Sequence, residues 1–192
     1  MQMRRLLLAF IAIAITSQAI TAHAIVTNTF HVYKMKSKEI FDWDYDGDDD
    51  DDDDYDNDKD KPETYYMVVE VDSQGRFVDG YFIEVYKDEG QKYYYYESFC
   101  SSDLKGPYYP TDKAAIGRVS IYGDIVFSGK QKNGLLLSAK GFLVDDCGEF
   151  QAESWTIKYD KKLSKETSEA TDIDNALSKI TAYLESRGYI VD

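Results

Sequence analysis

Apolar and polar side chains alternate along most of the chain between Val26 and Tyr159, which is the pattern of half-buried β-strands. The run Thr64–Asp72 shows it most clearly, because Tyr65, Met67, Val69 and Val71 fall on one face of an extended chain. The same alternation predicts that one face of the next strand carries four apolar residues, Phe77, Tyr81, Ile83 and Val85. Strands are predicted at Val26–Met35, Thr64–Asp72, Phe77–Val85, Gln91–Phe99, Ile116–Phe127, Leu135–Val144 and Phe150–Tyr159, with a break of Ile116–Phe127 at Gly123 as the alternative. Ser101–Lys113 is expected to be a loop, and Ser128–Asn133 a turn.

The period changes near the C-terminal end of the sequence. Ile173, Leu177, Ile180 and Leu184 recur at helical spacing and form one apolar stripe. Thr171 is the expected cap at the start of this helix, and Gly188 the expected stop after its end. A single stripe fits a helix that packs one face on its own sheet, with docking to a partner as the alternative.

These elements define a fold class. The sequence predicts a mainly β protein, an antiparallel meander that forms a barrel or a curved sheet with one C-terminal amphipathic helix. A β-sandwich is the alternative arrangement of the same strands. The strands are too few and too irregular for an outer-membrane barrel.

The first 24 residues have the features of a cleavable signal peptide. Arg4 and Arg5 precede an apolar run of about ten residues, which is too short to span a bilayer as a helix. Ala22-His23-Ala24 then supplies the small-x-small pattern of a cleavage site. We expect an exported protein, periplasmic or secreted, whose mature chain 25–192 is one β-rich domain without a membrane span.

Negative charge is concentrated in one stretch of the sequence. The chain carries a formal net charge of −14, and residues 42–60 hold 13 Asp and one Lys, which is −12. Such a segment repels itself, so that an acidic, disordered insertion at 42–61 is one expectation. The charge also argues against nucleic acid and favours calcium or a basic protein as partner.

The acidic stretch begins with a spacing that suits calcium. Carboxylates alternate before Gly47, and calcium takes six to eight oxygen ligands in a loop that a glycine lets turn sharply. The pattern DxDxDGxxDxxD at 42–53 resembles the acidic loops of EF-hand-like and thrombospondin type 3 repeats, although Asp stands at position 12 in place of Glu. The ligands that this resemblance implies are Asp42, Asp44, Asp46, Asp48, Asp50 and Asp53.

Catalytic signals are weak in this sequence. Cys100 and Cys147 are expected to form a disulfide after export, which would leave no free thiol nucleophile. His31 is the one histidine outside the signal peptide, and the usual hydrolase motifs are absent from the sequence. We therefore expect a protein that is not an enzyme.

The preferred hypothesis is an exported binding protein whose poly-Asp loop binds calcium or a basic partner. One alternative is an inhibitor of a cationic secreted enzyme such as lysozyme. Another is a carbohydrate-binding module that uses exposed tyrosines, since Tyr93–Tyr96 are consecutive and two of them should point to each face of a strand. A small carboxylate-dependent hydrolase is the third.

Overall fold

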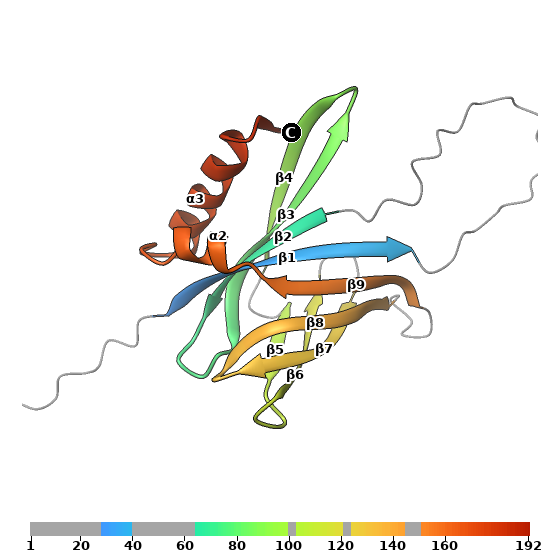
Figure 1. The fold of residues 1–192 in the computed structure, drawn as a ribbon, viewed down its shortest axis with the longest axis vertical. Coiled ribbons are helices and arrows are strands. Elements are labelled where there is room, and N and C mark those ends of the chain that lie inside the picture. Colours follow the sequence, from blue (N-terminus) through green and yellow to red (C-terminus); the bar gives the residue numbers. More distant parts are fainter. Residues whose placement is uncertain (1–27, 40–63, 100–102, 121–123, 145–150) are drawn as a thin grey trace, which may run out of the picture.

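The computed structural model describes residues 28–39, 64–99, 103–120, 124–144 and 151–192 (Figure 1). Ten strands lie in these ranges: β1 (Thr29–Glu39), β2 (Thr64–Val71), β3 (Phe77–Asp88), β4 (Gln91–Phe99), β5 (Leu104–Tyr108), β6 (Ala114–Ser120), β7 (Asp124–Lys132), β8 (Leu135–Val144), β9 (Gln151–Tyr159) and β10 (Tyr189–Val191). The helices of the described chain are α2 (Lys161–Glu166) and α3 (Ile173–Glu185). The prediction of a mainly β fold with a C-terminal helix is confirmed.

All of these strands belong to one sheet, in the order β10-β4-β3-β2-β1-β9-β8-β7-β6-β5. Neighbouring strands are antiparallel, except that β10 runs parallel to β4. The sheet is strongly curved, because side chains from β1 and β2 pack into the same core as side chains from β6, β7 and β8. It is not closed into a barrel, so that of the predicted arrangements the curved sheet is the one that forms.

The concave side of the sheet encloses the larger core. Its fully buried side chains include Tyr33, Met67, Phe127 and Ile157, from four different strands. Aromatic rings fill the centre, where Tyr65 stacks on Phe82 with ring centroids 4.9 Å apart. Alternate residues of β1, β2 and β7–β9 contribute to this core, which accounts for the alternation in the sequence.

Phe77 belongs to this concave core, and not to the face of Tyr81 and Ile83 on which the sequence pattern placed it. The cause is a register shift between β2 and β3: Glu70 pairs with Asp79, but Val71 pairs with Phe77. The extra residue between them is a bulge, and a bulge exchanges the faces of the residues on its two sides.

The helices cover the other, convex side of the sheet over β1–β4 (Figure 1). Leu163 of α2 and Ala176, Leu177, Ile180 and Leu184 of α3 are buried there. The apolar stripe predicted for α3 is thus confirmed, and it packs on its own sheet. The helix begins one residue later than expected, because Asp172 is the N-cap and accepts a hydrogen bond from the Asn175 backbone N–H at 2.7 Å.

Two polar side chains join α2 to the edge of this second core. The Val32 backbone N–H donates to Ser164 Oγ at 2.8 Å, and Thr167 Oγ1 donates to the Phe30 carbonyl at 3.0 Å. Asp160 caps α2 by accepting from the Lys162 and Leu163 backbone N–H groups. The position of α2 on β1 is therefore fixed by hydrogen bonds as well as by apolar contact.

Two segments that the sequence pattern assigned to connections are partly strand. Leu104–Tyr108 forms the edge strand β5, since an edge position tolerates the missing N–H of Pro107. Ser128–Lys132 continues β7, and the turn lies at Asn133-Gly134. The prediction of a turn at Ser128–Asn133 was wrong because it relied on polar composition, and the outward residues of a strand are polar too when that face of the sheet is exposed.

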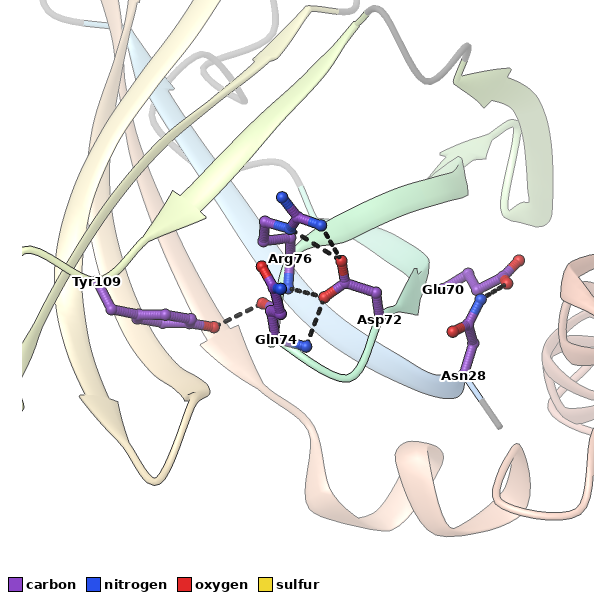
Figure 2. A network of polar contacts seen from close by, with 7 residues as sticks. Asn28, Glu70, Asp72, Gln74, Arg76 and Tyr109 are labelled. Atoms are coloured by element: carbon purple, nitrogen blue, oxygen red, sulfur yellow. Dashed lines mark hydrogen bonds and ion pairs between the residues drawn. The ribbon is translucent and has the colours of Figure 1, made fainter. Parts of the chain in front are cut away.

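Tyr109 links turns that are far apart in the sequence (Figure 2). Its hydroxyl lies 2.6 Å from the Gly75 carbonyl and also within hydrogen-bond reach of the Gly134 carbonyl, so that one proton is shared between the β2–β3 and β7–β8 turns. Asp72 shapes the first of these turns by accepting from the Gln74 and Arg76 backbone N–H groups. These bonds hold the curved sheet where its two halves approach each other.

Candidate functional site

The residues that the sequence singled out as a calcium site lie outside the described ranges. This applies to Asp42, Asp44, Asp46, Asp48, Asp50 and Asp53, and likewise to the predicted disulfide partners Cys100 and Cys147. Both assignments therefore stay predictions. Within the described part of the chain, no group of three or more His, Cys, Asp or Glu side chains is placed to hold a metal ion. The helices described there are all too short or too polar to cross a membrane.

His31 is a partly buried side chain of β1. It lies on the concave side of β1, where its ring meets the ring of Tyr159 edge-on with centroids 5.5 Å apart. Burial lowers the pKa of His31 from 6.5 to about 4, so that the imidazole is uncharged at neutral pH. Its Nε2 lies 3.2 Å from Thr29 Oγ1.

The four consecutive tyrosines of β4 point alternately to the two faces of the strand, as predicted. Tyr94 alone of the four is buried, and its hydroxyl donates to Glu185 of α3 at 3.0 Å. Tyr95 and Tyr96 are 42% and 41% exposed and point to opposite sides of the β3–β4 hairpin. The ring of Tyr93 stacks on Tyr86 with centroids 5.5 Å apart.

A different surface emerges on the convex side of the sheet, over the strands that the helices do not cover. Cross-strand partners share a face, so the strand registers show which side chains lie together. One row on the concave side links Met35, Ile157, Ala139, Gly129 and Ala115. The next row along the strands faces the convex side and consists of Lys36, Thr156, Lys140, Ser128 and Ile116.

Two further convex rows flank this one. The first consists of Lys34, Lys158, Ser138, Lys130 and Ala114. The second consists of Lys38, Ser154, Phe142, Val126, Arg118 and Lys105. We call these three rows, on β1, β9, β8, β7, β6 and β5, the cationic face.

The cationic face is unbalanced in charge. Eight of its side chains are basic: Lys34, Lys36, Lys38, Lys105, Arg118, Lys130, Lys140 and Lys158. Among the described residues of these six strands, Asp124 is the one carboxylate at a convex-facing position, and it forms an ion pair with Arg118. Seven lysines thus lie on one side of six adjacent strands of a protein whose net charge is −14.

Exposed apolar side chains lie among these lysines. Phe142, Val126 and Ile116 are 41%, 48% and 48% exposed, and they occupy adjacent strands. Tyr108, which pairs with Ile116, is 55% exposed. Figure 1 shows that α2 and α3 lie over the other half of the sheet, away from β5–β8. The cationic face is therefore both charged and apolar, which makes it a candidate contact surface.

The cationic face was not predicted from the sequence. Lys34, Lys36 and Lys38 alternate in one strand, and this is the signal that was available. Nothing local reveals that β9 and β8 lie beside β1, because that neighbourhood joins residues more than 100 positions apart. The chain matches no protein-family model, no curated protein and no solved structure to which it was compared.

Proposed function

We propose that this chain is an exported, non-catalytic binding protein whose cationic face binds an acidic polysaccharide. The observation that carries the proposal is that seven lysines and one arginine lie on the convex side of β1 and β5–β9, where Asp124 is the one carboxylate among the described residues of these strands. A cluster of positive charges attracts a negatively charged polymer.

The spacing of the lysines favours a repeating ligand over a small ion. Lys36 and Lys140 lie in one row two strands apart, which is roughly 10 Å at the usual distance between strands. A chain of charged sugar units can meet such separated ammonium groups in succession. Thr156 lies between these two lysines and Ser128 lies beyond Lys140, and their hydroxyls match the donors and acceptors of sugars.

The exposed rings on the face fit the apolar surfaces of sugar rings. Phe142 of β8 and Tyr108 of β5 are each more than a third exposed. Helices α2 and α3 lie over the other half of the sheet (Figure 1). Aromatic side chains combine a large contact area with little conformational entropy to lose. Arg118 is already paired with Asp124, so that the lysines are the main cations of the face for an anionic ligand.

The overall negative charge of the chain does not prevent this binding. Exposed charges are screened over about 8 Å at physiological salt, so a ligand at the face responds mainly to the nearest lysines. The affinity should therefore fall steeply as salt is added.

The test is binding of heparin and of alginate, with neutral dextran as the control ligand. Both the unaltered chain and a variant with the 13 Asp of 42–60 changed to Asn are measured. We expect heparin and alginate to bind and dextran not to bind. Lys36→Gln, Lys130→Gln and Lys140→Gln together should lower the affinity at least about tenfold, since each loses one close charge contact.

The matched control is Lys87→Gln with Lys165→Gln, which removes exposed lysines from the β3–β4 hairpin and from α2. This pair should leave the affinity unchanged. Absence of polysaccharide binding by both forms of the chain, or equal binding by the two lysine variants, would contradict the proposal. If a single-stranded oligonucleotide or anionic vesicles bind more strongly than the polysaccharides, that ligand, and not a polysaccharide, is the partner of the cationic face.

A second candidate is carbohydrate binding at the β3–β4 hairpin. The exposure of Tyr95 and Tyr96 and the Tyr86–Tyr93 stack favour it, because exposed aromatic rings stack on neutral sugars. Retention on a neutral polysaccharide that is lost in Tyr95→Ala and Tyr96→Ala, but kept in the lysine variants, would select this surface.

A further inference from the structure

The cationic face has a partner of opposite charge within the same chain. Residues 42–60 carry a charge of −12, and the face carries eight basic side chains against the carboxylate of Asp124. No other stretch of the sequence has an acidic excess of this size. Charge complementarity therefore points to one internal occupant of the face.

The acidic stretch is connected to the sheet at the border of the face. Residues 40–63 join the end of β1, at Glu39, to the start of β2, at Thr64. Thr64 pairs with Lys36 in the sheet, so the chain leaves and returns beside two lysines of the cationic face, Lys36 and Lys38. Both ends are thus next to the surface that matches the charge.

The connection is long enough to cover the face. It has 24 residues, and an extended chain spans at most about 3.3 Å per residue, or roughly 80 Å in total. A segment that must return to its starting point reaches about half of this. From β1 to β5 there are five strand-to-strand steps, or roughly 24 Å, so every lysine of the face is within reach.

We infer that the Asp-rich segment 42–60 binds to the cationic face of its own chain and is a built-in competitor for acidic ligands. The tether keeps the carboxylates at an effective concentration on the order of millimolar, well above that of an external ligand in dilute solution. An acidic polysaccharide would then have to displace the segment. In this respect the inference deepens the proposed function and uses the same face.

The experiment is zero-length cross-linking of the full chain with a carbodiimide, which joins a carboxylate and an amine that are in contact. It is done without ligand, so its outcome does not depend on whether the face binds a polysaccharide. Cross-linked peptides are identified by mass spectrometry. An equimolar mixture of unlabelled and ¹⁵N-labelled chains separates bonds within a chain from bonds between chains.

The informative lysines are those distant from the connection along the sheet, Lys130 of β7 and Lys140 of β8. We expect Asp residues of 42–60 to couple to these two several-fold more often than to Lys87 and Lys165, which are also exposed but lie off the face. The cross-links should join like-labelled peptides, and they should be lost in 1 M salt, where screening acts over about 3 Å.

Three results would overturn the inference. Cross-links spread evenly over the exposed lysines would show an unbound segment, as would coupling confined to Lys36 and Lys38. Mixed-label cross-links in the majority would show that a second copy supplies the segment. If the cross-links appear as expected and no polysaccharide binds in the binding assay, the proposed function fails while this inference stands.

Discussion

The convex side of this sheet carries two different surfaces on one continuous set of strands. Over β2–β4 and the start of β1 its buried outward residues are apolar, such as Val32, Val68 and Ile83, and helices α2 and α3 cover them. Over β9–β5 its outward residues are lysines, hydroxyls and a few exposed apolar side chains. The backbone alternation is the same in both halves, so the outward residues alone decide which half is covered by the protein itself.

The concave side, by contrast, unites the two halves. Met67 of β2 and Phe127 of β7 are buried in one core, although the outward side of β2 is covered by helix α3 and that of β7 belongs to the cationic face. The uncovered half therefore obtains its stability from one face only, which leaves its other face available for ligand contacts. The comparison makes quantitative predictions.

The largest expected effect is a difference in stability loss between alanine substitutions of two isoleucines, one on each half of the convex side. Ile180→Ala removes a fully buried side chain between α3 and the sheet, and we expect the free energy of unfolding to fall by about 2–5 kcal/mol. Ile116→Ala is the matched change on the cationic face, where the side chain is 48% exposed, and should cost about 1 kcal/mol or less. Urea denaturation of both variants measures the difference, and equal losses would show that the uncovered face is packed against something else.

Acid should act on the shared concave core through His31. Its pKa is 6.5 when unfolded and about 4 when folded, because burial disfavours the charged imidazole. The unfolded chain therefore binds more protons between these values, and stability falls as the pH is lowered from 6.5 towards 4, by roughly 3 kcal/mol in all.

The control for this prediction is His31→Gln, which has no group titrating in that range. The variant should lose roughly 3 kcal/mol less stability than the unaltered chain between pH 6.5 and pH 4. Urea denaturation at several pH values gives both curves. Parallel curves would mean that His31 is hydrated in the folded protein.

The sequence predicted the features that depend only on the spacing of apolar residues along one strand or helix. The bounds of β4 and β8 agree with the predicted runs Gln91–Phe99 and Leu135–Val144, and the apolar stripe of α3 is buried. Phe77 was assigned to the wrong face, because a bulge depends on the partner strand. The cationic face was missed for a related reason: it exists through the placement of β9 beside β1, a contact between distant parts of the chain.

A smaller effect should follow from loosening the contact between the halves at Tyr109. Tyr109→Phe removes the hydroxyl that serves the Gly75 and Gly134 carbonyls, and we expect a loss of about 1 kcal/mol. Burial raises the pKa of Tyr109 from 10 to about 12. The contribution of this protonated hydroxyl is present below pH 10 and is lost as the pH rises through 12, so the variant should lose less stability than the unaltered chain in alkali. Urea denaturation at pH 8 and pH 11 tests both statements.

The smallest expected effect concerns calcium and the acidic segment. If the carboxylates of Asp42–Asp53 bind calcium, the ion neutralises the charge that we infer to lie on the cationic face, and the two partners compete for the segment. Calorimetric titration of calcium into chain 25–192 should give a saturable heat for one or two ions, which a chain lacking 42–60 does not give. The Lys36→Gln, Lys130→Gln and Lys140→Gln variant should then bind calcium more tightly, since fewer lysines hold the carboxylates. Equal heats with and without 42–60 would show that this segment does not bind calcium. Equal calcium affinities in the unaltered chain and the triple lysine variant would show that the metal site and the cationic face do not compete for the segment.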